Sequence, residues 1–188
     1  MNKQTKITLF LICMQTSLFA TKETKLFEKV TSTQTEEINS CISILSKREN
    51  SVRICPLMNP KQIQKFINQA TKTKSSSLWI QRNNAHQVVA FALCDHSQNN
   101  QKSSSTHIHA VAVDPEQKRQ GFGKQLMLNL LANLKKLSPS ITLTVEYNNE
   151  AAKKLYEKVG FISSPNKDKT FIAYSYGRKQ IQKNPSAK

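Results

Sequence analysis

The sequence contains little glycine, few aromatic residues and no long hydrophobic run. Glycine accounts for 4 of the 188 residues and aromatic residues for 7%. The apolar stretch nearest the start, residues 7–20, is too short to span a bilayer comfortably, so we expect no transmembrane helix in the mature chain. Few aromatic residues and the lack of a recognised nucleic-acid-binding motif argue against a stable nucleic-acid partner.

Cysteine is also scarce. The four cysteines, Cys13, Cys41, Cys55 and Cys94, form no C-x-x-C pair. Zinc sites are commonly built from such pairs, so the sequence predicts no metal site. Cys41 lies in a helix-like pattern and Cys94 in an apolar strand-like run, which favours two small core residues. If the chain is exported, two of Cys41, Cys55 and Cys94 could form a disulfide, and the sequence does not indicate which.

Acidic residues are few compared with basic ones. The chain has 28 Lys and Arg against 12 Asp and Glu, which gives a net charge of +16. This excess favours acidic partners such as nucleic acid, anionic lipid or a phosphate-bearing cofactor. The basic residues are spread along the chain without one long block, and this spread is typical of an ordinary solvated surface.

The first twenty residues resemble a secretory signal peptide, with a basic start, an apolar stretch and Ala20 as the last residue before cleavage. Gln15, Thr16 and Ser17 interrupt the apolar run, and Leu18 stands where a small residue is preferred. The alternative is an ordinary strand or short helix. We therefore expect a signal peptide over residues 1–20, one domain over 21–176 and a basic flexible tail over 177–188.

Hydrophobic periodicity predicts one α/β domain. A capping-box pattern at residues 33–36 predicts the start of a first helix, and Pro60 predicts the start of a second. Residues 96–105 are expected to form a polar loop. Strands are expected at residues 25–30, 78–82, 87–95, 106–114 and 141–147, followed by a final pair near 161–164 and 170–176. Two further helices are expected at residues 124–137 and 149–160, the second ending at Gly160.

Two of the four glycines, Gly121 and Gly123, lie in the stretch KRQGFGK between a predicted strand and a predicted helix. A turn of this kind directs free backbone N–H groups and the positive end of the helix dipole at one place, which suits phosphate. The stretch has neither the P-loop pattern nor the dinucleotide-binding pattern, because Leu126 replaces the third glycine. The alternative is a tight turn that begins a helix.

Two blocks resemble the motifs of the GNAT superfamily, the acyl-CoA-dependent N-acetyltransferases. HIHAVAVDPEQKRQGFGKQLMLNLL is similar to the cofactor-binding motif, and NNEAAKKLYEKVGF is similar to the second motif. Lys118 departs from the first motif, where Gln or Arg is usual. The second is matched in register by Asn149, Ala152, Leu155, Tyr156, Gly160 and Phe161. The resemblance implies a twisted mixed sheet of six to seven strands flanked by about four helices, with acetyl-CoA as cosubstrate.

The resemblance also implies residue roles. Asn149 would hold the cofactor near its thioester, or else only cap a helix. Tyr156 would protonate the departing thiolate. The pantetheine arm would lie along Val111, Ala112 and Val113. The pyrophosphate would meet backbone amides of Arg119, Gln120, Gly121, Phe122, Gly123 and Lys124.

The general base is less defined. His107 stands where many family members place a glutamate, and a histidine titrates near neutrality. His109 lies on the same strand face. A second family position for glutamate is occupied by Thr144, which cannot act as a base, so Glu146 is the fallback. Each histidine would otherwise be an ordinary strand residue.

These features predict an N-acetyltransferase that transfers an acetyl group from acetyl-CoA to a primary amine by direct attack. The acceptor is a small molecule or a protein, and the net charge favours an acidic one. The alternative is a basic module that binds CoA or nucleic acid without turnover. A signal-like start favours export, while the supply of acetyl-CoA favours the cytoplasm, or the host cytosol for a secreted protein.

Overall fold

A computed structural model describes residues 25–47, 59–99, 103–164 and 170–177. The predicted signal-like segment, the tail beyond residue 177, Cys13 and Cys55 lie outside them. Within these ranges no helix is both long and apolar enough to cross a membrane. The described strands are β1 (Phe27–Val30), β2 (Ser76–Arg82), β3 (Val88–Asn99), β4 (Ser103–Val113), β5 (Ser140–Glu146), β6 (Ile162–Ser163) and β7 (Phe171–Tyr176).

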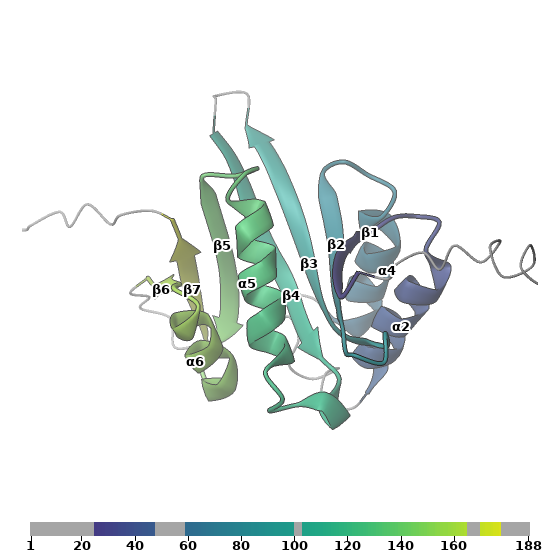
Figure 1. The fold of residues 1–188 in the computed structure, drawn as a ribbon. Helices are drawn as coiled ribbons and strands as arrows, with labels where there is room; N and C mark the ends of the chain where they lie inside the picture. Colours follow the sequence, from purple (N-terminus) through teal and green to yellow (C-terminus); the bar gives the residue numbers. More distant parts are fainter. Residues whose placement is uncertain (1–24, 48–58, 100–102, 165–169, 178–188) are drawn as a thin grey trace, which may run out of the picture.

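The strands form one mixed sheet in the order β1-β2-β3-β4-β5-β7-β6 (Figure 1). Among the described residues, four α-helices cover it, which confirms the expected α/β fold. Two of these helices lie on each face, as the two hydrophobic clusters show. The helices are α2 (Thr35–Ser46), α4 (Pro60–Ala70), α5 (Phe122–Leu134) and α6 (Glu150–Lys158), and a short 3-10 helix, η1 (Pro115–Gln117), precedes α5.

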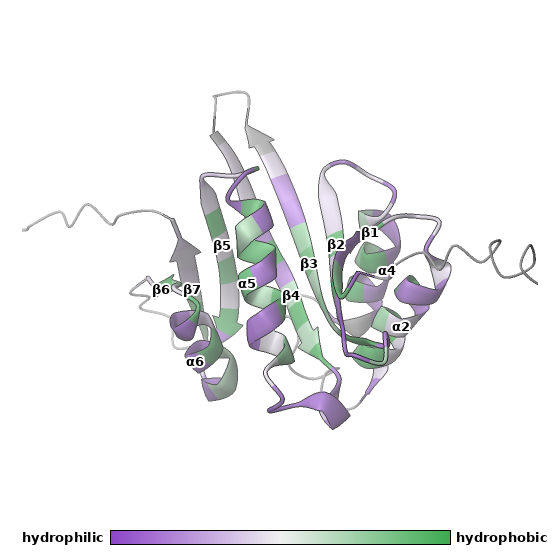
Figure 2. Ribbon diagram, viewed as in Figure 1, coloured by the Kyte–Doolittle hydropathy of each residue, from purple (hydrophilic) through white to green (hydrophobic). Residues whose placement is uncertain are grey.

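Helix cover differs between the two halves of the sheet. All seven residues of β2 are buried, because α2 and α4 cover one face and α5 covers the other. Figure 2 shows the corresponding hydrophobic bands on the central strands. In β5, by contrast, burial alternates after the first two residues. The side chains of β5 that face α5 and α6 are buried, and those on the opposite face are partly exposed.

Two local predictions were wrong. The first helix is capped at Gln34 without a side-chain cap hydrogen bond, so residues 33–36 form no capping box. A capping box instead joins Asn59 and Gln62 at the start of α4. The polar stretch expected as a loop is largely strand, since β3 and β4 stay paired as far as Asn99 and Ser103. Backbone pairing does not require apolar side chains, so the polar composition of residues 96–105 wrongly suggested a loop.

The predicted core cysteines are confirmed. Cys41 and Cys94 are fully buried free thiols, one in each hydrophobic cluster. Burial raises the pKa of the Cys94 thiol to about 12 and raises the pKa of Cys41 as well. Neither thiol is therefore a ready nucleophile.

The parallel pairing of β4 with β5 is short. It runs from Ser105 opposite Ser140 to Ile108 opposite Leu143, although β4 continues to Val113. At the end of this pairing β4 carries a bulge, because Ile108 and Ala110 face consecutive residues of β3 and His109 is the extra residue. Beyond the bulge the two strands separate, and this separation positions the site described below.

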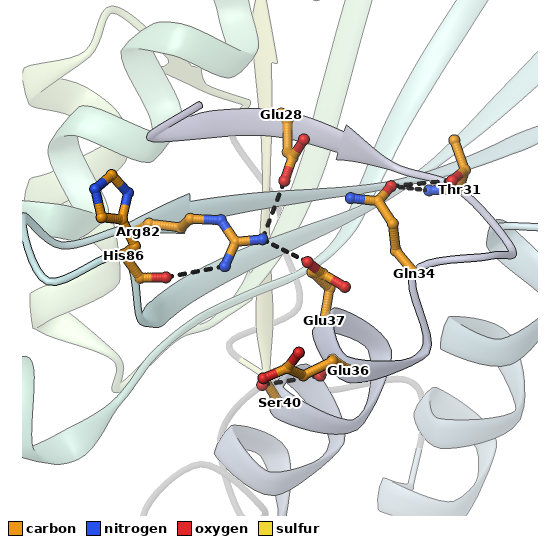
Figure 3. A network of polar contacts seen from close by, with 8 residues as sticks. All are labelled: Glu28, Thr31, Gln34, Glu36, Glu37, Ser40, Arg82 and His86. Atoms are coloured by element: carbon orange, nitrogen blue, oxygen red, sulfur yellow. Dashed lines mark hydrogen bonds and ion pairs between the residues drawn. The ribbon is translucent and has the colours of Figure 1, made fainter. Parts of the chain in front are cut away.

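A buried arginine ties three elements together (Figure 3). The side chain of Arg82 is 9% exposed. Its Nη2 donates to Glu28 at 3.1 Å and to Glu37 at 2.7 Å, and its Nη1 donates to the backbone oxygen of His86 at 3.0 Å. These contacts join β1 and α2 to the β2–β3 turn, where His86 has a left-handed φ of 61°.

We predict that Glu37→Gln lowers the free energy of unfolding by about 1–3 kcal/mol, because Arg82 then stays buried with one carboxylate fewer. Glu36→Gln is the matched control, since Glu36 is exposed in the same first helical turn, and it should change stability by less than about 0.5 kcal/mol. Urea unfolding of both variants measures the difference. Equal losses in the two variants would contradict the account.

Candidate functional site

The glycine turn has the geometry of an anion site. Arg119 and Gly121 both adopt left-handed backbone angles, with φ of 63° and 88°. Left-handed residues in a turn aim successive N–H groups into one concavity. Gly121 is also the N-cap of α5 and provides no side-chain cap hydrogen bond. The first N–H groups of α5 therefore have no capping side chain and can serve a ligand.

The turn forms one wall of a cleft of about 660 Å³. Val111 and Val113 contribute from β4, and Leu155 contributes from α6. The cleft thus lies on the α5 and α6 side of the sheet, next to the part of β4 that β5 does not pair. The other lining residues are Gln117, Lys118, Arg119, Gly121, Phe122, Gly123, Lys124, Asn149, Ala151, Ala152 and Lys158.

All charged residues that line the cleft are basic. Lys118, Arg119, Lys124 and Lys158 line it, and none of its lining residues is Asp or Glu. Apolar side chains occupy the part nearest β4. An arrangement of cations around amide donors, with an apolar wall behind, fits an elongated ligand that is anionic at one end. The residues therefore fit CoA, which carries phosphates at one end of a neutral arm.

Gly121 and Gly123 differ in why they are glycine. A Cβ at Gly121 would meet nothing within 4 Å, but its φ is one that other residues rarely adopt. A Cβ at Gly123 would lie 3.3 Å from Val113 and 3.5 Å from Leu155. Gly121 is thus required for the turn, while Gly123 lets α5 pack closely against β4 and α6.

Eight of the ten predicted cofactor residues line the cleft, and Ala112 and Gln120 do not. Ala112 points to the opposite face, where it is buried in the core beneath α2 and α4, and Gln120 is exposed. Sequence reasoning missed Gln117, Ala151, Ala152, Leu155 and Lys158 as lining residues. Leu155 lies four residues after Ala151, and Lys158 lies three residues after Leu155. This spacing places the three residues on one face of a helix and could have identified them as part of the cleft wall.

Of the two residues of the second motif with predicted roles, Asn149 lines the cleft and Tyr156 does not. Asn149 lines the cleft and also caps α6, since its Oδ1 accepts from the N–H of Ala152 at 3.2 Å. Tyr156 lies one helical turn beyond Ala152 and is 8% exposed. Its ring packs against Phe161 and Tyr174, and it is not a lining residue. Tyr156 therefore lies behind the cleft wall, on the same side of the sheet.

The two histidines lie on the other face of the sheet. His109 packs edge-on against Phe66 of α4, with ring centroids 5.0 Å apart. His107 and His109 are 4.7 Å apart by ring centroid, which confirms their common face. His107 Nδ1 is 2.9 Å from the hydroxyl of Thr142. His109 Nε2 is 3.9 Å from a carboxylate oxygen of Asp95.

Burial controls the protonation of both imidazoles. It lowers the pKa of His107, and the neighbouring His109 lowers it further. Burial also lowers the pKa of His109, opposed by Asp95. Both rings are therefore mostly neutral at pH 7, as a base must be. Glu146, the fallback base, is partly exposed at the end of β5. Among the described residues no group of His, Cys, Asp and Glu could hold a metal ion.

Comparison with known proteins gives one curated relative and many solved structures. Over 84 residues the chain is 32% identical to peptidyl-lysine N-acetyltransferase YjaB of Escherichia coli K12. The match covers 45% of this chain and 48% of that protein, so the chain spans about half the length of the curated relative.

The solved structures share the fold. The ribosomal-protein-S5-alanine acetyltransferase of Vibrio fischeri matches with a TM-score of 0.61 and 12% identity, over 82% of this chain and 94% of that one. The NatC complex bound to Gag peptide and CoA matches with a TM-score of 0.58 and 16% identity, over 79% of this chain and 94% of that one.

The model of the acetyltransferase (GNAT) family matches residues 45–161, which is more than half of the chain and includes both motifs. The turn, the cleft and the separated strands lie within the matched residues. The chain belongs to the acetyltransferase (GNAT) family.

Proposed function

We propose that the protein is an N-acetyltransferase that uses acetyl-CoA as cosubstrate and a primary amine as acceptor. The observation that carries the proposal is the turn at Arg119 and Gly121, whose amides open into a cleft lined by cations. Family membership and the name of the curated relative support the reaction class.

The donor binds along the α5 side of the separated strands. Backbone amides of the turn hold the pyrophosphate, assisted by Lys118, Arg119 and Lys124. The part of β4 that β5 does not pair, near Val111, pairs with the amides of the pantetheine arm, as an added strand would. Asn149 holds the arm from α6. This placement would bring the thioester to the point where β4 and β5 part, near the bulge at His109.

The acceptor approaches from the opposite face, where helices leave β5 partly uncovered. His107 removes a proton from the ammonium group, directly or through water. The amine nitrogen forms its bond to the carbonyl carbon, and the carbon–sulfur bond breaks. A backbone N–H at the strand end stabilises the oxyanion. Tyr156 protonates the departing thiolate from the α6 side. The nitrogen loses its second proton as the tetrahedral intermediate collapses, and a proton from solvent restores the Tyr156 phenol.

The acceptor carries a primary amine on an acidic molecule or an acidic protein surface. The net charge of +16 supports this choice, because it attracts anions from a distance. The name of the curated relative makes a lysine side chain the first acceptor to test. Lysine peptides with acidic and with basic flanking residues would separate the effect of the acceptor's charge from the recognition of the lysine side chain itself.

The second candidate function is a CoA-binding module without turnover. The burial of Tyr156 behind the cleft wall is the observation that favours it, since a buried phenol can be a core residue alone. The two candidates differ in one measurable respect. A binding module would hold CoA but release no thiol from acetyl-CoA with any amine.

We predict that Gly123→Glu strongly weakens CoA binding, because its Cβ would lie only 3.3 Å from Val113 and its carboxylate adds a negative charge to the turn. Leu128→Glu is the control, since Leu128 is exposed on the same helix and does not line the cleft. Calorimetric titration of CoA should show binding to the wild type and the control, and at least about 30-fold weaker binding to Gly123→Glu. Undiminished binding to a folded Gly123→Glu variant would place the phosphates elsewhere.

We predict that Tyr156→Phe lowers kcat by about 10²-fold while the affinity for CoA stays unchanged, because only the proton donor is lost. Tyr147→Phe is the matched control, since Tyr147 is 50% exposed. Thiol release from acetyl-CoA with a lysine peptide measures both variants. A Tyr156→Phe variant with wild-type kcat would assign Tyr156 to the core alone.

The low pKa of His107 predicts the pH dependence. The acidic limb of the kcat profile should lie below pH 6.5, the ordinary value for histidine, because burial disfavours the charged ring. The His107→Gln variant should lose most of its activity and this limb together. An unchanged limb in His107→Gln, with activity retained, would transfer the role of base to another group such as Glu146.

A further inference from the structure

One lysine outside the cleft is paired with two carboxylates at the entrance to the glycine turn. Lys47 Nζ lies 2.7 Å from Asp114 Oδ1 and 3.0 Å from Glu116 Oε1. Those two residues are 67 and 69 positions away in the sequence. These three charged residues belong to neither hydrophobic cluster, and none of them lines the cleft.

The pair connects elements from different parts of the fold. Lys47 is the C-cap of α2, which packs on the face opposite α5. Asp114 follows β4 directly, and its N–H donates to Val89 of β3. The same Asp114 carboxylate that meets Lys47 also caps η1, accepting from the N–H of Glu116 at 3.1 Å. Lys47 thus holds the segment that leads from β4 into the turn.

The contact of Lys47 with the two carboxylates also affects the electrostatics of the glycine turn. The chain has 12 carboxylate side chains, and two of them stand immediately before the turn. Gln117 and Lys118, which follow Glu116, already line the cleft. Two uncompensated negative charges at that place would oppose the binding of phosphates. Lys47 lies against both carboxylates and offsets one of the two charges.

We propose that Lys47 is a positioning residue for cofactor binding, which compensates Asp114 and Glu116 and so keeps the entrance of the turn compatible with phosphate. The inference rests on the proposed acetyl-CoA site. It assigns to the end of α2 a part in binding CoA, although α2 lies on the acceptor side. Acceptor-side and donor-side elements are then linked through one ion pair.

The structural alternative is an ion pair that only stabilises the fold. The side chain of Glu116 is 77% exposed and that of Lys47 is 32% exposed, so this pair contributes little to folding stability. The side chain of Asp114 is 18% exposed, but its carboxylate keeps the hydrogen bond from the N–H of Glu116 when Lys47 is replaced. We therefore expect Lys47→Met to leave the thermal midpoint nearly unchanged while it weakens CoA binding. The two readouts separate a role in binding from a role in stability.

The experiment titrates CoA into the full chain and its variants by calorimetry. Lys47→Met should weaken binding about fivefold in about 50 mM salt, and the ratio to wild type should fall toward one in about 500 mM salt, because salt screens the exposed carboxylates. Lys47→Arg should bind CoA as the wild type does. Adding Glu116→Gln to Lys47→Met should recover at least half of the loss.

Lys72→Met is the matched control, since it removes the same charge from an exposed lysine just after α4, and it should bind CoA normally. Equal affinities of Lys47→Met and wild type would overturn the inference and leave the proposed function standing. A loss that salt does not reduce, or that Glu116→Gln does not relieve, would also overturn it. Absence of CoA binding to the wild type would overturn the inference and the proposed function together.

Discussion

The separation of β4 from β5 is the constraint on which the candidate site depends. Parallel pairing ends at Ile108 and Leu143, and the bulge at His109 bends β4 where the pairing ends. Beyond this point β5 no longer pairs with β4, and the cleft lies beside this part of β4. A ligand arm with amide groups can pair with strand backbone there, as an added strand does. The separation therefore explains why an elongated cosubstrate fits here.

The bulge also divides the chemistry between the two faces of the sheet. Strict alternation along β4 would place His107 and His109 on the face of Val111 and Val113. The extra residue shifts the alternation, so the histidines lie near α4 while the valines line the cleft below α5. In our proposal, the base and the acid then act from opposite sides of the reacting carbon. The net positive charge acts over longer distances and favours the approach of anions.

The local features of the site could be predicted from the sequence. The turn at Gly121 and the start of α6 at Asn149 follow from a few adjacent residues, and the structure contains both. Features that depend on tertiary contacts could not be predicted. The Lys47–Asp114 contact, the side of the sheet on which His107 lies and the depth of Tyr156 all depend on packing. Polar composition also hid the long β3–β4 pairing, because strand pairing uses the backbone.

The most direct test of the central claim is amide hydrogen exchange of the full chain with and without acetyl-CoA. The account predicts that bound acetyl-CoA slows exchange at residues 119–124 and along the part of β4 that β5 does not pair, from His109 to Val113. Amides of β2, which β3 separates from β4, should not change. Unchanged exchange at the turn and at β4, under conditions where acetyl-CoA is bound, would contradict the account.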